Sequence, residues 1–212
     1  MSGKLEHART LHPSLLKFCG YLAIFGAIAL VVGNIWGSLV VPDHDWVADT
    51  VSDLAAGEYE IIQDFALYLY AAGLLGLALA GAHFHAGKRW WSAGILSLAI
   101  LAALVVVIGA RNEYGDGDNE GVVIHIYLVY GLGVFFLIAP LSLARGLAKR
   151  STRDAMISRG CAIAWGIAAP IFFFLPTEFD GLWERGLGVI TVIWVIMMGL
   201  HFLRAAQDLA ES

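Results

Sequence analysis

The sequence predicts an all-α integral membrane protein, a bundle of six transmembrane helices with both termini in the cytoplasm. Of its 212 residues, 59% are hydrophobic and 15% are charged, whereas about a quarter of the residues in a soluble domain are charged. The mean hydropathy is +0.74, and the few charges lie in short clusters between long apolar runs. Because a bilayer core about 30 Å thick requires roughly 20 apolar residues per helix, these runs predict spanning helices in a single membrane domain over residues 1–212.

Each apolar run must be helical, because an open backbone finds no water to bond in the bilayer core. The first run is longer than the apolar region of a signal peptide, about 7–15 residues, and no small-residue cleavage site follows it, so we expect it to be retained. Pro140 and Pro170 lie within or near predicted spans, where proline removes a helical hydrogen bond and favours a kink. The six predicted spans cover about residues 18–41, 61–84, 91–110, 122–144, 156–175 and 187–203.

Lysine and arginine predict the orientation, because these residues are enriched in cytoplasmic connections. Only Arg111 and Arg185 lie on the side opposite the N-terminus. This asymmetry predicts cytoplasmic termini in a plasma-membrane protein. The other eleven of the thirteen cations share the N-terminal side: Lys4, Arg9, Lys17, Lys88, Arg89, Arg145, Lys149, Arg150, Arg153, Arg159 and Arg204.

Three segments resemble a known family. They are VADTVSDLAAG before the second span, NEGVVIHIYLVYG at the head of the fourth, and GLWERGLGVITVIWVIMMGLHFLR in the sixth. Together they are similar to a prokaryotic six-span family catalogued as domain-of-unknown-function family 998, over nearly the whole chain. The resemblance implies the six-helix fold and no particular activity. The positions that match the family's short motifs are Ser52, Asp53, His125, Glu184 and Arg185.

Acidic residues collect on the predicted outer side, which carries fourteen of the eighteen carboxylates. Asp49, Ser52 and Asp53 are spaced so that one helical turn would place them on one face. Asp64 falls about one turn inside the second span, and an ionisable group there suggests function because its burial is costly. If the heads of the second and fourth spans meet, the sequence predicts an outer polar pocket of Asp49, Ser52, Asp53, Asp64, His125, Glu184 and Arg185.

Four of these residues, Asp53, Asp64, His125 and Glu184, could hold a divalent metal. Carboxylates suit calcium, magnesium or manganese, and an added histidine suits zinc or iron.

The alternative is structural. Ser52 and Asp53 would cap a short helix, Asp64 would pair with Arg111 or Arg185, and His125 would be a satisfied core histidine. The acidic loop at 116–120 lacks the spacing of a calcium-binding loop and is interpreted as a solvated turn.

Other cofactors and partners are less favoured. His83 and His85 are two residues apart and point to different helix faces, and His125 lies toward the other side, so the pattern does not favour haem. Gly33 and Gly37 allow close helix packing, which is more often intramolecular than dimeric. The sequence has no basic stripe of the kind that binds nucleic acid. Membrane lipids are the expected partners, and a protein partner or a homo-oligomer stays open.

Three functions fit these observations. The first is a non-catalytic accessory protein that binds lipid or a protein partner, because nucleotide-binding and common catalytic motifs are absent from the sequence. The second is a metal-assisted hydrolase that acts on lipid at the outer leaflet. The third is a small-solute or proton-coupled transporter that uses Asp64 and His125, although the two halves of the chain show no internal repeat.

Overall fold

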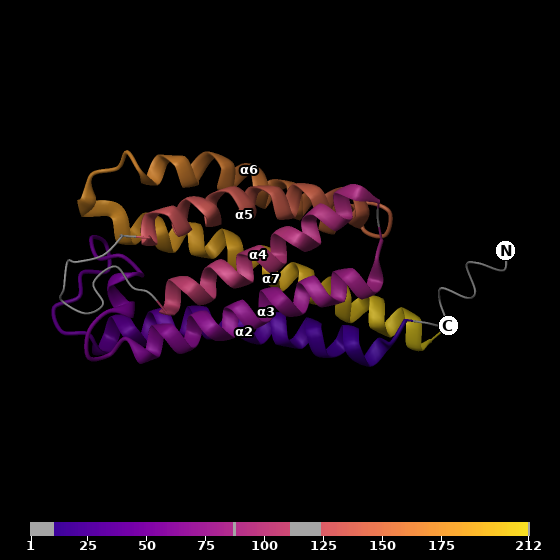
Figure 1. Ribbon diagram of the computed structural model, residues 1–212, viewed down its shortest axis with the longest axis horizontal. Coiled ribbons are helices and arrows are strands. Elements are labelled where there is room, and N and C mark those ends of the chain that lie inside the picture. The colour runs from indigo at the N-terminus through magenta and orange to yellow at the C-terminus, as the bar shows by residue number, and fades with distance from the viewer. Residues whose placement is uncertain (1–10, 87, 111–123, 212) are drawn as a thin grey trace.

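The computed structural model describes residues 11–86, 88–110 and 124–211, in which long helices dominate (Figure 1). In this part of the chain six helices are long and apolar enough to cross a bilayer, which confirms the predicted fold class. The protein is therefore a multi-pass membrane protein. The six helices are α2 (Pro13–Val40), α3 (Ile61–Phe84), α4 (Arg89–Ala110), α5 (His125–Leu147), α6 (Thr152–Phe172) and α7 (Asp180–Ala210), with short 3-10 helices η1 (Asp53–Ala55) and η2 (Thr177–Phe179).

The predicted boundaries agree best for α3 and least for α7. The sixth span was expected at 187–203, but α7 extends by about two turns at each end. Hydropathy detects only the apolar centre of a helix, whereas the backbone hydrogen-bond ladder continues through polar turns outside the hydrocarbon. Residues 122–123 of the expected fourth span and the acidic loop at 116–120 lie outside the described residues.

The helices form a ring in chain order. Each helix packs against its neighbours in sequence, and α7 returns to pack between α6 and α2 (Figure 1). The start of α2 and the end of α7 lie together at one end, here named the terminal end. The opposite end, named the loop end, carries the connection between α2 and α3, residues 41–60, which we call the α2–α3 loop. A ring that closes in this way brings the start of α7 beside that loop.

Small residues allow the closest contact in the ring, between α2 and α3. A Cβ atom at Gly26 would overlap the carbonyl oxygen of Leu69, and one at Gly33 would overlap the Cβ of Ala66. Gly37 packs on Leu54 of η1. Both glycines of the small-residue pair in α2 therefore face segments of their own chain, as close packing of membrane helices requires.

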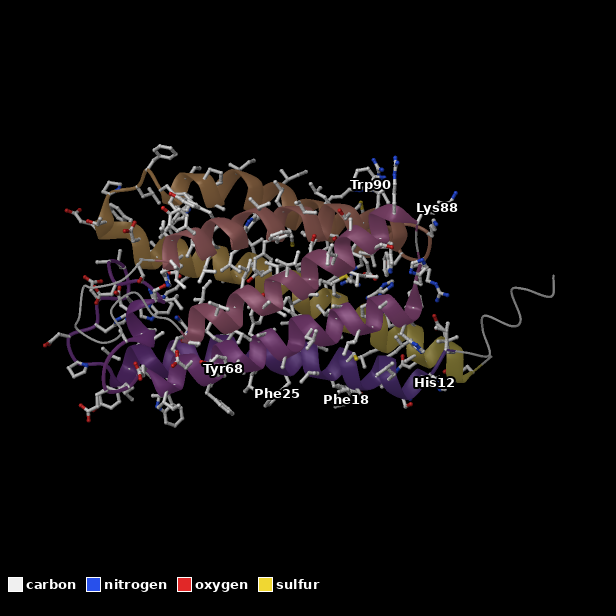
Figure 2. The ribbon with its side chains drawn as sticks, viewed as in Figure 1. His12, Phe18, Phe25, Tyr68, Lys88 and Trp90 are labelled. Atoms are coloured by element: carbon white, nitrogen blue, oxygen red, sulfur yellow. The ribbon has the colours of Figure 1, made fainter. Side chains whose placement is uncertain are left out.

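The outer surface of the bundle is apolar along its length, as a lipid-facing surface must be. Figure 2 shows Phe18, Phe25 and Tyr68 projecting outward from one side, and Phe18 is 64% exposed. At the terminal end Trp90 carries the guanidinium groups of Arg89 and Arg145 over its ring, at 5.5 and 5.0 Å. Such aromatic and cationic side chains are typical of the membrane–water boundary.

A buried ionic cluster joins α6 to α7 near the terminal end. The carboxylate of Asp154, only 1% exposed, accepts hydrogen bonds from Arg204 Nη2 at 3.0 and 3.1 Å. It also lies 2.7 Å from His201 Nδ1. Because the carboxylate is an acceptor beside a permanent cation, Nδ1 carries the proton of that imidazole. The cluster therefore fixes the terminal end of the two helices and leaves the loop end for other contacts.

Candidate functional site

The α2–α3 loop lies over the loop end of the bundle and caps α7. The backbone N–H groups of Gly181 and Leu182 donate to the carbonyl oxygens of Ala48 and Val47, at 3.1 and 3.0 Å. These are groups that a helix start leaves without an intrahelical partner. A Cβ at Gly181 would overlap the Asp49 carbonyl oxygen, so this contact requires glycine. The loop thus takes the place that the Ser151 side chain has at the start of α6, where it accepts a hydrogen bond from the backbone N–H of Asp154.

The side chain of Arg185, 7% exposed, holds the same loop from below. Its guanidinium group lies 4.7 Å from the centre of the Trp46 ring. All five of its N–H groups have acceptors, and each acceptor is uncharged. The acceptors lie on α2 and on the loop: Asn34 Oδ1 (3.2 Å), Trp46 O (3.1 Å), Asp49 O (2.7 Å), Ser38 Oγ (3.4 Å) and His44 Nε2 (2.8 Å).

Two carboxylates complete the attachment. Glu184 Oε2 accepts a hydrogen bond from the backbone N–H of Val51 at 2.7 Å. Asp53 Oδ2 accepts from the backbone N–H and the hydroxyl of Thr50, at 2.6 and 2.8 Å, so its carboxylate closes a turn within the loop. Adjacent residues of α7 therefore bind the loop through opposite charges, the Glu184 carboxylate and the Arg185 guanidinium.

The loop brings Ser52 to the first residue of α5. Ser52 Oγ lies 3.2 Å from His125 Nε2, within hydrogen-bonding distance. The His125 side chain is mostly buried, and its Nδ1 atom has no hydrogen-bond partner in the part of the chain that the structure describes. Ser52 precedes η1, yet its side chain makes no capping bond to a described residue. The structural alternative is therefore wrong for Ser52, which is not a helix cap. For His125, the described residues supply a partner to Nε2 and none to Nδ1.

These residues lie at the mouth of a cavity of about 1030 Å³, at the upper end of the roughly 300–1,000 Å³ usual for small-molecule sites. All six long helices contribute to its wall, mainly from the half nearer the loop end. Aliphatic and aromatic side chains make up most of the wall. The polar lining residues are Asn34, Thr50, Ser52, Tyr70, His125, Tyr130, Asp180, Glu184, Arg185 and Thr191.

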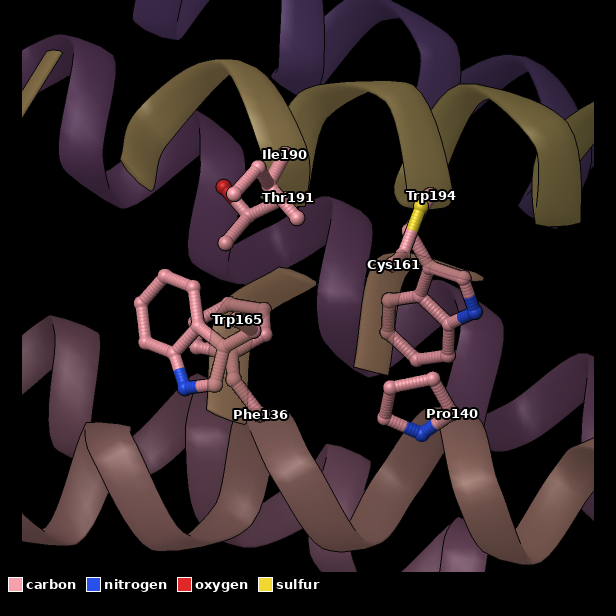
Figure 3. Close-up of a pocket in the computed structure, with 7 residues that line it drawn as sticks. All are labelled: Phe136, Pro140, Cys161, Trp165, Ile190, Thr191 and Trp194. Atoms are coloured by element: carbon pink, nitrogen blue, oxygen red, sulfur yellow. The ribbon is translucent and has the colours of Figure 1, made fainter. Parts of the chain in front are cut away.

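The inner end of the cavity is tightly packed. Figure 3 shows Phe136 of α5, Trp165 of α6 and Thr191 of α7 facing one another there. These three residues line both the large cavity and a void of about 10 Å³ beyond it, which has room for about one water molecule. Trp165 Nε1 donates to Gly133 O at 2.9 Å and locks the indole in place. The cavity therefore closes on aromatic side chains near the middle of the bundle.

Three residues in the cavity wall carry buried polar atoms that have no hydrogen-bond partner among the described residues: Asn34 Nδ2, Tyr70 OH and His125 Nδ1. The amide of Asn34 is oriented by Arg185, which donates to Oδ1, so Nδ2 is the free donor. The Tyr70 hydroxyl interacts with Thr191 without reaching hydrogen-bonding geometry. Leaving such groups unpaired costs about 1–3 kcal/mol each. Each atom is screened from solvent in this conformation, so a ligand in the cavity could pair with it once a side-chain rotation exposes it.

The structure gathers most of the predicted polar pocket but not all of it. Ser52, His125, Glu184 and Arg185 line the cavity, and Asp49 and Asp53 lie in the loop that covers it. Asp64 is not among the described lining residues, and it forms no ion pair with Arg185. Arg111, the other partner considered for Asp64, lies outside the described residues. The second and fourth spans, α3 and α5, do not pack closely against each other as expected, because α4 packs between them. The loop, rather than the head of α3, supplies the groups that face His125.

The predicted metal site gains no support from this arrangement. Within residues 11–86, 88–110 and 124–211, no three or more His, Cys, Asp or Glu side chains are grouped closely enough to hold a metal ion. The carboxylates of Asp53 and Glu184 instead bond backbone N–H groups of the loop. Sequence reasoning missed Asn34 and Tyr70, for which the available signal was a polar side chain inside a long apolar run.

The fold and the site define a class: a six-helix membrane protein with a largely apolar cavity that a polar loop covers at one end. The chain belongs to the family described as Protein of unknown function (DUF998), whose family model matches residues 24–201. The matched segment contains the whole α2–α3 loop and the lining of the cavity. Neither the curated proteins nor the solved structures gave a match.

Replacing Arg185 with lysine is expected to release the loop. Lysine has three donors on a flexible stem and cannot reproduce the planar fork. Since a hydrogen bond from a charged donor contributes about 1.5–3 kcal/mol, the loss of two or more should lower the stability by about 3 kcal/mol or more. Thermal unfolding in detergent micelles measures this change. The exposed Arg159→Lys is the matched control, and equal unfolding temperatures for the two variants would contradict the assigned role.

His44 makes the same attachment sensitive to pH. Its side chain is 2% exposed, with Nε2 facing Arg185 and Nδ1 lying 3.5 Å from Asp49 Oδ2. Arginine has only donors, so Nε2 must accept and cannot carry a proton. Burial, and next the charge of Arg185, lowers the pKa of His44 below its ordinary value of 6.5. Protonation of Nε2 would place its N–H donor against the N–H donor of Arg185 Nη2.

Stability is therefore expected to fall on acidification. Above the ordinary pKa, His44 is neutral in both states; below about 6.5 the unfolded chain binds the proton more readily, so folding is disfavoured. The unfolding temperature of the wild type should be lower at pH 5 than at pH 7.5. His44→Gln keeps an acceptor but does not titrate, so this variant should show a smaller drop. The exposed His85→Asn should retain the wild-type drop; a full drop in His44→Gln would refute the mechanism.

Proposed function

We propose that the protein binds a membrane lipid, or an amphiphile of similar shape, in the cavity at the loop end. The observation that carries this proposal is the order of groups along the cavity. Hydroxyl, imidazole and carboxylate groups lie at its mouth, unpaired donors lie on its wall, and aromatic side chains lie at its inner end. An amphiphile has the same order, with a polar head, carbonyl oxygens at the neck and an apolar tail.

The charges at the mouth favour a particular class of headgroup. Arg185 already donates all its N–H groups to the protein, so it offers nothing to a phosphate or a carboxylate. Apart from the two tyrosines, the ionisable groups that remain in the lining are Asp180, Glu184 and His125. We therefore propose that the head of the ligand donates hydrogen bonds, as a hydroxyl or an amine does. Asn34 Nδ2 and the Tyr70 hydroxyl are suited to its acceptor oxygens.

We also propose that the terminal end faces the cytoplasm and that the protein resides in the plasma membrane. Among the described residues the cations gather at the terminal end, with Arg185 at the loop end. Cytoplasmic connections are enriched in such residues. The cavity then opens within the outer leaflet, and its ligand is a lipid of that leaflet.

The lipid proposal is tested by filling the cavity. A Cβ at Gly188, which lines the cavity, meets open space, and so does one at Gly186, which is exposed and is not among the described lining residues. Gly188→Phe is expected to reduce retained lipid about tenfold or more, because overpacking costs about 1–3 kcal/mol. Gly186→Phe is the matched control on the same helix. The measurement is bound lipid per mole of protein, by mass spectrometry after detergent washing.

A second variant separates binding from folding. Tyr70→Phe removes a hydroxyl that has no hydrogen-bond partner among the described residues, so the unliganded protein should not be destabilised. Lipid retention should fall about two- to tenfold, as the loss of one hydrogen bond of about 0.5–1.4 kcal/mol implies. Equal lipid content in wild type, Gly188→Phe and Gly186→Phe would overturn the proposed function.

The orientation is tested with reporters fused after residue 212. A fluorescent protein that matures only in the cytoplasm should be active there, and a phosphatase that is active only outside should be silent. The reverse pattern would place the cavity in the inner leaflet and refute the proposed orientation.

A further inference from the structure

Ser52 and His125 form a hydroxyl–imidazole pair at the mouth of the cavity. Their side chains come from different parts of the chain, the α2–α3 loop and the first residue of α5, and meet with Oγ 3.2 Å from Nε2. Both residues line the cavity. A hydroxyl within reach of an imidazole nitrogen is the geometry by which a serine is activated as a nucleophile.

The Ser52 hydroxyl differs from other serine hydroxyls of the bundle. Those of Ser38, Ser97 and Ser158 donate to backbone carbonyl oxygens, within their own helix or across to α5. The bond of the Ser52 hydroxyl is to a side chain that can accept its proton. In the loop itself, Thr50 rather than Ser52 closes the turn with Asp53.

His125 is held where a general base would have to be. Its side chain is 7% exposed, and Nδ1 lacks a hydrogen-bond partner among the described residues. When Nδ1 carries the proton, Nε2 presents its lone pair to the serine hydroxyl. Buried polar groups are usually paired, and among the described residues only the Nε2 atom of His125 has a partner.

We propose that Ser52 and His125 are a nucleophile and its base, which cleave a carboxylic ester of the amphiphile in the cavity; this inference rests on the proposed function. The hydroxyl proton of Ser52 passes to His125 Nε2 as Oγ bonds to the carbonyl carbon. The ester C–O bond then breaks, and the alcohol leaves with the proton from Nε2. Water, deprotonated by the same nitrogen, attacks the acyl-serine and releases a carboxylic acid, which restores the hydroxyl.

The rest of the cavity suits an ester as the reacting group. Asn34 Nδ2 and the Tyr70 hydroxyl are donors that lack protein partners in the described chain, and carbonyl oxygens are acceptors. Leu30, Phe136 and Trp165 provide an apolar wall for an acyl chain. The substrate class is therefore an acyl ester of an alcohol whose polar part stays at the mouth.

Among the described residues, no carboxylate bonds the Nδ1 atom of His125. A pair without such a carboxylate is expected to turn over slowly. In enzymes that have such a carboxylate, its neutralisation lowers the rate about 10⁴-fold. Covalent capture of the nucleophile is therefore a better assay than product formation. A fluorescent fluorophosphonate reacts with an activated serine and remains attached.

The experiment uses the full chain in detergent micelles, and compares wild type with Ser52→Ala, His125→Gln and the control Ser97→Ala. Wild type and Ser97→Ala should be labelled, with the adduct on the peptide that contains Ser52. Ser52→Ala should be unlabelled. His125→Gln should react about 10²-fold or more slowly, because general-base assistance is typically of that size.

Bound lipid is measured on the same samples, so the two proposals fail separately. Wild type that retains lipid but is not labelled overturns the ester-cleaving pair and leaves lipid binding in place. Wild type that neither retains lipid nor is labelled overturns both proposals. An adduct on another serine, or labelling that His125→Gln leaves unchanged, also overturns the pair. The position of the wild-type adduct decides the question even where a variant fails to fold.

Discussion

The attachment of the α2–α3 loop to Arg185 is the interaction on which the loop end depends. A buried guanidinium group is tolerated only when its charge and its donors are matched, and here five uncharged acceptors from α2 and the loop satisfy it. The loop in turn supplies the carbonyl groups that cap α7. Helix, loop and cation therefore stabilise one another. Without this attachment, the roof of the cavity and the position of Ser52 would not be defined.

The attachment of Arg185 also limits the groups that the cavity offers to a ligand. The cation nearest the mouth has no donor left for a ligand, while Asn34, Tyr70 and His125 carry polar atoms without partners among the described residues. In the proposed function, recognition depends on neutral donors and on the carboxylates of the lining, which suits an uncharged or amine-bearing amphiphile. The same order of groups places a hydroxyl–imidazole pair where the head and neck of that amphiphile would lie.

The structure brings four residues of the predicted pocket together, but with other partners than the sequence suggested. Ser52, His125, Glu184 and Arg185 were all expected at one polar pocket, and all line the cavity. Asp64 was expected with them and is not among the described lining residues, because a one-dimensional pattern gives the depth of a residue but not the neighbour that its helix faces. The capping role considered for Ser52 depended on a local hydrogen bond, whereas the bond observed joins residues 73 positions apart.

The number of spans, their approximate lengths and the asymmetry of charge were determined by the sequence alone, because the bilayer imposes a length and a polarity on every helix separately. The ring order, the placement of α4 between α3 and α5, and the cavity were decided only by the tertiary structure. Packing depends on which small residues and hydrogen bonds meet across helices, and these contacts join positions far apart in the chain. The site at the loop end belongs to this second group, since it exists only when the loop, α5 and α7 converge.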